Sequence, residues 1–196
     1  MEPRSLIPVF DGQWRGRRMM ARELREAVEN VYRLGTLLAD DAKFAITIRE
    51  SLGSTPEAKR VYVRSVFAFV EGMTHAFKRF AVAVHDHGGP LFSEAEVSLL
   101  RGVSYELKDT GEAASKQRFV RFAPNVRLAI RAFALASGYD GRLDYSTAGW
   151  QALREAARVR NRITHPRTPA DLDVSDADLE AVTWVFGGFS LRRARS

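Results

Sequence analysis

The sequence has no cysteine among its 196 residues and only four histidines. Without cysteine the chain has no disulfide framework, no thiolate nucleophile, no zinc finger with cysteine ligands and no iron–sulfur cluster. A chain without disulfides suits a reducing compartment. The remaining catalytic candidates are mostly histidines and carboxylates.

Long apolar runs are also missing. The most apolar stretch, residues 61–84, contains five ionisable side chains that a lipid-facing helix would not carry: Arg64, Glu71, His75, Lys78 and Arg79. The first ten residues include Pro3 and Pro8 and have no apolar segment of the length found in signal peptides. We therefore expect a cytoplasmic protein with no membrane partner.

Acidic residues are in the minority, with 24 acidic against 30 basic side chains and a net charge of +6. Arginine accounts for 25 of the basic residues and lysine for only five. A surplus of this size permits nucleic acid as a partner, although charge alone does not establish one.

Strand-like alternation of apolar and polar residues is absent too, because nearly every periodic segment repeats at about 3.6 residues. The pattern predicts an all-α fold, an elongated helical bundle with a long second helix and a short C-terminal helix. A chain of this length suits one domain with its own core. We expect residues 1–17 to form an N-terminal extension and residues 18–196 a single bundle.

Local signals place the first two helices. Apolar positions at helical spacing predict a helix over residues 18–51, with a break near Asp40 and Asp41. Thr55 is a suitable N-cap for a second helix, which continues for about 30 residues to a stop at residues 88–90. Such a long helix would form the backbone of the bundle.

The middle of the chain is less regular. Ser93 and Glu96, three residues apart, form a capping-box pattern that opens a third helix. Helical periodicity is then lost, and we interpret residues 108–123 as a mobile loop or as one ordered by a partner. Pro124 is expected to begin a fourth helix, which Gly138 ends.

The last two helices are expected over residues 146–165 and from Ser175 onwards. At about 100° per residue, Arg160 falls in the middle of the apolar side of the first of them. A guanidinium there must be paired, or must line a pocket or an interface. Asn161 and His165 share the edge of that side, so with Arg160 they can surround one cavity mouth. Three other arginines form the solvent stripe: Arg154, Arg158 and Arg162.

The segment RNRITHP, Arg160 to Pro166, resembles the signature of the HEPN domain superfamily. That signature is an arginine, a polar residue, three further positions and a histidine near the end of a late helix. The context also fits, because a proline, an acidic loop and one more short amphipathic helix follow the motif. In detail the resemblance covers residues 150–189, and beyond them it is a likeness of architecture.

The resemblance implies a helical bundle that commonly forms homodimers, with the two motifs close together across the interface, and in many members a metal-independent ribonuclease. In this chemistry the 2′-hydroxyl of RNA is the nucleophile, and the products are a 2′,3′-cyclic phosphate and a 5′-hydroxyl. The implied roles are general acid or base for His165 and phosphate ligand for Arg160, while Asn161 orients the imidazole or the phosphate. We expect an endoribonuclease, a toxin or phage-defence effector, that needs no metal or cofactor. Its partners would be an RNA substrate, a second copy of the chain and a cognate antitoxin or inhibitor protein.

Glu71, near the apolar face of the second helix, is the expected partner of Arg160 and a supporting residue of the site. This pairing leaves two interpretations open. Glu71 could hold the arginine ready for phosphate. Alternatively, it could bind Arg160 permanently in a non-catalytic HEPN-like module for dimerisation, nucleotide binding or complex assembly. His165 would then only stabilise the C-terminal end of its helix.

Other arginines are weaker candidates for RNA binding. Arg118 and Arg121 alternate with Phe119 and Phe122, a pattern that can grip single-stranded RNA by stacking and phosphate contacts. A loop whose two phenylalanines anchor it in the core would show the same pattern. Arg162 is the third candidate, because it is expected to face solvent.

Overall fold

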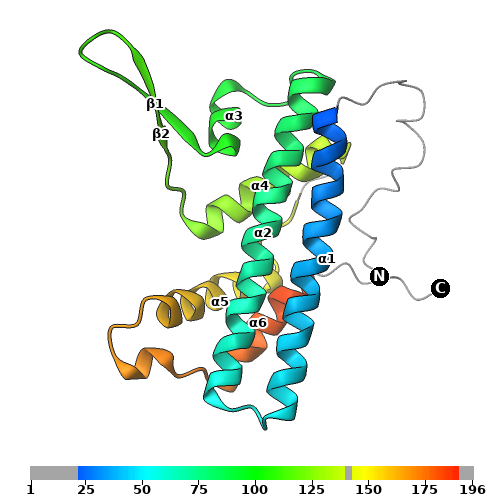
Figure 1. Cartoon of the computed structure of the whole chain (residues 1–196), viewed down its shortest axis with the longest axis vertical. Coiled ribbons are helices and arrows are strands. Elements are labelled where there is room, and N and C mark those ends of the chain that lie inside the picture. The colour runs from blue at the N-terminus through cyan, green and yellow to red at the C-terminus, as the bar shows by residue number, and fades with distance from the viewer. Residues whose placement is uncertain (1–21, 140–142, 190–196) are drawn as a thin grey trace, which may run out of the picture. The chain divides into compact units, whose positions relative to one another are not determined.

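The computed structural model describes residues 22–139 and 143–189, and this part of the chain is mostly α-helical (Figure 1). In chain order its elements are α1 (Arg22–Ser51), α2 (Pro56–Gly88), α3 (Glu94–Arg101), β1 (Val103–Leu107), β2 (Ala113–Gln117), α4 (Phe122–Ala136), α5 (Ala148–Thr164), the 3-10 helix η1 (Pro169–Leu172) and α6 (Asp176–Phe189). The predicted all-α class with a long second helix is confirmed, with one small sheet in addition. The predicted extension at residues 1–17 and the start of the first helix at residue 18 lie outside the described residues.

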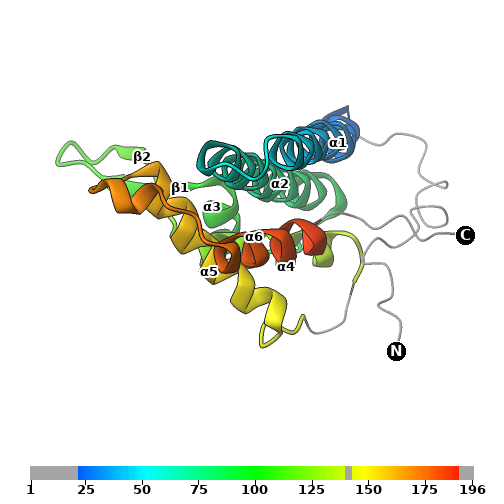
Figure 2. The same cartoon turned by 90° about the horizontal axis from the view of Figure 1, so that it is seen from below.

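The described residues form two compact units, each containing one part of α1 and one part of α2. Unit 1 comprises residues 22–32 and 74–139, and so adds α3, β1, β2 and α4 to the C-terminal part of α2. Unit 2 comprises residues 33–73 and 143–189, and adds α5, η1 and α6 to the N-terminal part of α2. Within each unit the segments of α1 and α2 lie side by side (Figures 1 and 2). The expectation that residues 18–196 form one bundle stays a prediction.

Three helix ends lie where short-range signals placed them. α2 follows Thr55, whose Oγ1 accepts a hydrogen bond from the backbone N–H of Ala58 at 3.4 Å. At the start of α3, Ser93 Oγ accepts from the N–H of Glu96 at 3.3 Å, and the Glu96 carboxylate accepts from the N–H of Ser93 at 3.0 Å. After α4, Gly138 adopts φ 81°, a left-handed conformation that favours glycine.

Two expected boundaries are wrong. α1 runs without a break through Asp40 and Asp41, and the ion pair between Asp40 and Lys43 at 2.8 Å is one that a continuous helix allows. α4 begins at Phe122 rather than at Pro124. The proline occupies the first turn of α4, where a backbone N–H would have no partner within the helix in any case.

The segment interpreted as a loop, residues 108–123, contains regular structure. β1 and β2 pair as an antiparallel hairpin, from Val103 opposite Gln117 to Leu107 opposite Ala113. Most side chains of both strands are exposed. The strands therefore lack the apolar–polar alternation by which a half-buried strand is recognised in a sequence. The interpretation of the whole segment as irregular is wrong, while its mobility and its ordering by a partner stay predictions.

Each unit has its own apolar core. The core of unit 1 joins α1, α2, α3 and α4 through buried side chains that include Leu24, Phe80, Val84, Phe92, Leu100 and Ala132. In unit 2, Phe69 of α2 and Phe186 of α6 pack edge to face with ring centroids 5.6 Å apart. Over the described ranges, no helix combines the length and the apolar character that crossing a bilayer requires.

Candidate functional site

The RNRITHP segment forms the last turns of α5 and the exit from that helix. One stripe of α5, with members three or four residues apart, is buried: Leu153, Ala156, Val159 and Ile163. The helix ends at Thr164, and the backbone N–H of His165 donates to the carbonyl of Asn161 at 3.0 Å. Pro166 follows at the point where the chain leaves the helix.

Arg160 lies partly buried on α5 and has two partners. Its Nη2 donates to Oε1 of Glu71 on α2 in an ion pair, and its Nη1 donates to Oδ1 of Asn161 at 3.1 Å. The expected pairing with Glu71 is thus confirmed. However, the Arg160 side chain is 28% exposed and that of Glu71 42% exposed, so the pair lies at the surface of unit 2. A guanidinium carries five N–H donors, and those that Glu71 and Asn161 do not use are available to a ligand.

His165 is exposed at the C-terminal cap of α5. Among the described residues, none forms a hydrogen bond or an ion pair with its imidazole. The structure therefore gathers Arg160, Asn161 and Glu71 into one contact group, and leaves the imidazole open to solvent beyond the end of the helix. An exposed imidazole can donate a hydrogen bond to a bound ligand or accept one from it.

Arg64 is a cation near this motif that sequence reasoning did not assign to the site. Its Nη2 donates to the backbone carbonyl of Ile163 at 3.4 Å, so its guanidinium lies at the last turn of α5, two residues before His165. Arg64 and Glu71 are seven residues apart on α2, about two turns, and therefore share a face of that helix. This spacing is visible in the sequence, where both residues interrupt the most apolar stretch.

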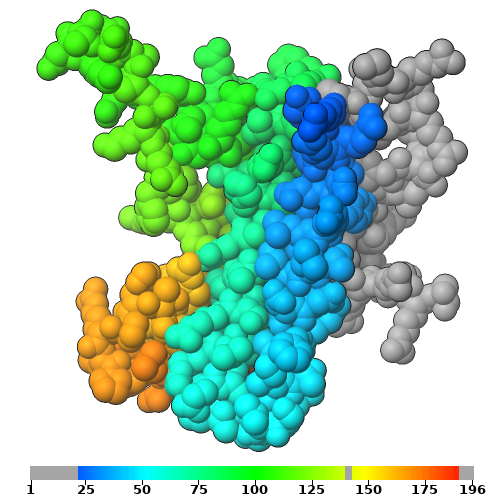
Figure 3. All heavy atoms as spheres, in the orientation of Figure 1, coloured from blue at the N-terminus to red at the C-terminus, as the bar shows by residue number. Residues whose placement is uncertain are grey.

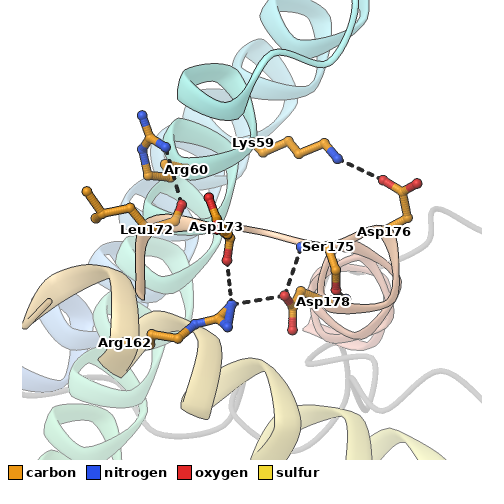
Figure 4. A network of polar contacts seen from close by, with 8 residues as sticks. All are labelled: Lys59, Arg60, Arg162, Leu172, Asp173, Ser175, Asp176 and Asp178. Carbon is orange, nitrogen blue, oxygen red and sulfur yellow. Dashed lines mark hydrogen bonds and ion pairs between the residues drawn. The ribbon is translucent and has the colours of Figure 1, made fainter. Parts of the chain in front are cut away.

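Arg162 does not face solvent as a free side chain, so this expectation is wrong. Its Nη2 donates to the carbonyl of Asp173 at 2.7 Å and to Oδ2 of Asp178 at 2.9 Å (Figure 4). Asp178 also accepts from the N–H of Ser175 at the start of α6. Arg162 thereby ties α5 to the connection between η1 and α6. The role of Arg162 in RNA binding stays a prediction. Its guanidinium already donates hydrogen bonds to two acceptors within the protein.

Two cations of α2 hold the same connection (Figure 4). Lys59 Nζ donates to Oδ1 of Asp176 at 2.8 Å, and Arg60 Nη1 donates to the carbonyl of Leu172 at 3.2 Å. The segment that follows the motif is therefore fixed to unit 2 by side chains of α2 and α5. The backbone of His165 is itself held by the hydrogen bond of its N–H to the carbonyl of Asn161.

Arg118 and Arg121 belong to unit 1, between β2 and α4. Both are exposed, and no hydrogen bond or ion pair joins either side chain to another described residue. Phe119 between them is 90% exposed, whereas Phe122 is partly buried. The alternative in which both phenylalanines anchor the segment in the core is therefore wrong for Phe119.

Unit 2 contains a pocket of about 470 Å³. Its lining does not include Arg160, Asn161 or His165, the residues around which we expected a cavity mouth. That pocket is lined by the turn between α1 and α2 and by α6, through residues that include Arg49, Glu50, Ser54, Asp176, Glu180 and Thr183. Within residues 22–139 and 143–189, no three histidine or carboxylate side chains are grouped so that they could hold a metal ion.

The end of α5 presents guanidinium groups that can bind an anion and, directly after the helix, an exposed imidazole that can transfer a proton. Arg160 offers a planar cation whose orientation is set by Glu71 and Asn161. Arg64 adds positive charge at the same turn of α5, and His165 adds an imidazole. Such a set can bind a phosphate group and move a proton next to it. Comparison of the chain with protein-family models, with curated proteins and with solved structures found no match.

Proposed function

We propose that the protein is a metal-independent endoribonuclease of the HEPN type, which acts in the cytoplasm as a homodimer. One observation carries the proposal: an exposed imidazole, His165, follows an arginine whose orientation is set by a carboxylate and an amide. The resemblance of RNRITHP to the HEPN signature supplies the reaction class. RNA brings its own nucleophile, so proton transfer and stabilisation of negative charge are the only tasks left to the protein.

Each side chain has a defined task in this reaction. His165 takes the proton of the 2′-hydroxyl, or gives one to the departing 5′-oxygen. The unused donors of Arg160 bind the non-bridging phosphate oxygens, whose negative charge grows as the 2′-oxygen attacks. Asn161 and Glu71 keep the guanidinium in position, and Arg64 adds a second positive charge. A homodimer with its two motifs facing each other brings a second imidazole for the opposite proton transfer.

Free endoribonuclease activity would damage the host cell. We therefore place the protein among toxins or phage-defence effectors, with a cognate antitoxin or inhibitor protein as its partner. The side chains named for the reaction supply the acid–base and cationic groups directly, so the proposed mechanism uses no metal ion or cofactor.

The test is cleavage of single-stranded RNA in buffer with EDTA. Wild-type protein should produce fragments that end in a 2′,3′-cyclic phosphate. His165→Ala should slow cleavage by about 100-fold or more, the usual contribution of a general acid or base. Arg160→Ala should cost about 100- to 1,000-fold, as for the loss of a donor to developing negative charge.

Arg154→Ala is the matched control, because Arg154 is an exposed arginine on the same helix. It should cleave RNA at the wild-type rate, and circular dichroism should show that all variants fold. RNA cleavage that survives in both His165→Ala and Arg160→Ala would refute the proposal. Sedimentation at micromolar concentration tests the homodimer, and a strict monomer contradicts that part.

The second candidate is a non-catalytic module for dimerisation, nucleotide binding or complex assembly. The ion pair between Arg160 and Glu71 favours this non-catalytic module, because the charge of the arginine is already balanced by a carboxylate of the protein. In that case His165 only stabilises the C-terminal end of α5, where a positively charged imidazole interacts favourably with the helix dipole. RNA that stays intact with dimeric, folded wild-type protein supports this module over the nuclease.

A further inference from the structure

The segment between β2 and α4 exposes an aromatic ring between two arginines. Phe119 is 90% exposed, the highest value among the exposed large apolar side chains of the described residues. On the adjoining strand β1, Tyr105 is 65% exposed and Leu107 is 76% exposed. A folded monomer gains no burial energy from presenting an aromatic ring to water, so a ring this exposed is available to a ligand.

The hairpin holds this segment in place. The backbone N–H of Arg118 donates to the carbonyl of Gly102 at 2.9 Å, directly beyond the last strand pair. At its other end, the carbonyl of Arg121 accepts from the N–H of Asn125 as α4 begins. The four residues from Arg118 to Arg121 are thus tied to structure at both ends. In Figure 3 the hairpin atoms, in green, lie at the surface of unit 1.

A third cation lies at the start of α4. Lys78 Nζ donates to Oδ1 of Asn125 at 3.1 Å, and Asn125 is in the turn that follows Arg121. The first turn of α4 has no acidic residue and no side-chain cap. Two acidic residues of the hairpin are already paired with lysines, Glu106 with Lys116 at 4.0 Å and Glu112 with Lys108 at 3.6 Å.

Within the described part of the chain, no carboxylate forms an ion pair with Lys78, whose partner is the amide oxygen of Asn125. Burial lowers the pKa of Lys78 from its ordinary value, with no opposing effect from a nearby negative charge. The pKa of His75, three residues earlier on α2, is lowered by burial and then by the positive charges of Arg79 and Lys78. A phosphate bound beside Lys78 would favour its charged form and so oppose the effect of burial on its pKa.

We propose that Arg118, Phe119, Arg121 and Lys78 form a docking surface for single-stranded RNA, on which a base stacks on Phe119 and phosphates contact the three cations. Base stacking on an exposed aromatic ring combined with backbone phosphate contacts is a general mode of single-strand binding. An acidic protein segment would match the charge but has no planar group for the ring. The inference deepens the proposed function by assigning a site that binds the RNA substrate.

The test is the affinity for a fluorescein-labelled single-stranded RNA, measured by anisotropy in the His165→Ala background so that the RNA stays intact. Phe119→Ala should weaken binding by at least about fivefold, the lower range for loss of one stacked base. Phe119→Trp should keep the affinity. Phe44→Ala is the matched control, because Phe44 is also exposed, at 66%, but lies on α1 in unit 2.

The phosphate contacts have a separate readout. Arg118→Ala and Arg121→Ala should each reduce the slope of log affinity against log salt concentration by about 0.7, the value for one phosphate contact with a single strand. Arg154→Ala should leave the slope unchanged.

Two results would overturn the docking surface. One is equal affinity of the Phe119→Ala and Phe44→Ala variants. The other is a polyglutamate peptide that binds as tightly as the RNA and with the same dependence on Phe119, which would indicate a protein partner. The proposed function fails separately: RNA that binds through Phe119 but is never cut by wild-type protein refutes the nuclease and leaves the surface standing.

Discussion

Two arginine-rich regions of this chain differ in what their arginines contact. In unit 2, Arg160 and Arg162 of α5 are bound by carboxylates, and Arg60 of α2 binds both a backbone carbonyl and Glu57. In unit 1, Arg118 and Arg121 contact no acidic side chain among the described residues. The same residue type holds the fold together in one region and stays available in the other.

The difference follows from the acceptors that surround each region. The connection before α6 supplies the backbone carbonyl of Asp173, and the first turn of α6 supplies the carboxylate of Asp178; both accept hydrogen bonds from Arg162. The start of α4 presents backbone N–H groups and no acidic residue. The first turn of α6 carries carboxylates that bind Arg162 and Lys59, whereas the first turn of α4 carries none, so the arginines before α4 have no acidic partner there. Whether an arginine remains available to a ligand therefore depends on the acceptors at the neighbouring helix ends more than on the number of arginines.

The largest effect on stability is expected from Arg162→Ala. This change removes two hydrogen bonds from a guanidinium and leaves Asp178 without its cation, and we expect a loss of about 2 kcal/mol in the free energy of unfolding. Chemical denaturation measures it. Arg158→Ala is the control, because the Arg158 side chain is 78% exposed. Arg158 has only an exposed ion pair with Glu155 at 3.6 Å, so equal stability of the two variants would remove the contrast between an arginine that ties segments together and one at the surface.

Glu71→Gln should have a smaller effect, about 1 kcal/mol, because the pair with Arg160 is partly exposed to water. Glutamine keeps the shape and a hydrogen-bond acceptor but loses the charge. The same denaturation experiment applies, with Glu50→Gln as an exposed control. A loss of about 3 kcal/mol or more, typical of a buried pair, contradicts the surface position of this pair.

Glu96→Gln tests a paired arginine within unit 1. Glu96 bonds both Arg131 and the N-cap Ser93, and these bonds, led by that from Arg131, lower its pKa below the ordinary value of 4.5. A carboxylate with a lowered pKa stabilises the fold above its unfolded pKa, and this contribution is lost as pH falls through the folded value. We expect Glu96→Gln to cost about 1 kcal/mol at pH 7.

The pH dependence gives the control for this prediction. Wild-type protein and Glu96→Gln should converge in stability as the pH falls well below 4.5. Glu94→Gln, on the same turn of α3 but exposed, should not reproduce the effect. A difference that is constant from pH 7 to pH 3 would show that the charge of Glu96 is not the cause.

The smallest effect is expected from Arg118→Ala, which should change stability by less than about 0.5 kcal/mol, as for an exposed residue without partners. Thermal unfolding of the variant beside Arg162→Ala measures the contrast directly. A loss comparable to that of Arg162→Ala would mean that Arg118 has a structural partner, and would weaken its assignment to an RNA surface.

Helix ends were predictable where one short segment contains all the partners. Thr55, Ser93 and Glu96 bind backbone groups three residues away, and Gly138 needs only its own conformation. The hairpin was not predictable in this way. Its strands bury neither face, so nothing in their side-chain pattern separates them from a loop.

The candidate site also combines features that local sequence predicts with features that depend on distant segments. The position of Arg160 on the apolar side of α5 followed from helical geometry, and so did its need for a partner such as Glu71. Arg162 was expected in solvent because the geometry of a single helix does not include Asp178 of α6. Phe119 was as compatible with the core as with the surface until its neighbours were placed.

By itself, the sequence determined the helical class, most helix ends and the spacing that sets Arg160, Asn161 and His165 at the end of α5. These features depend on groups within about four residues of each other along the chain, where helix geometry fixes the distances. Tertiary structure alone decided which arginines are bound, which remain free, and that an aromatic ring stays exposed beside two free arginines. Those outcomes depend on acceptors that come from segments far apart in the chain, and only packing brings them together.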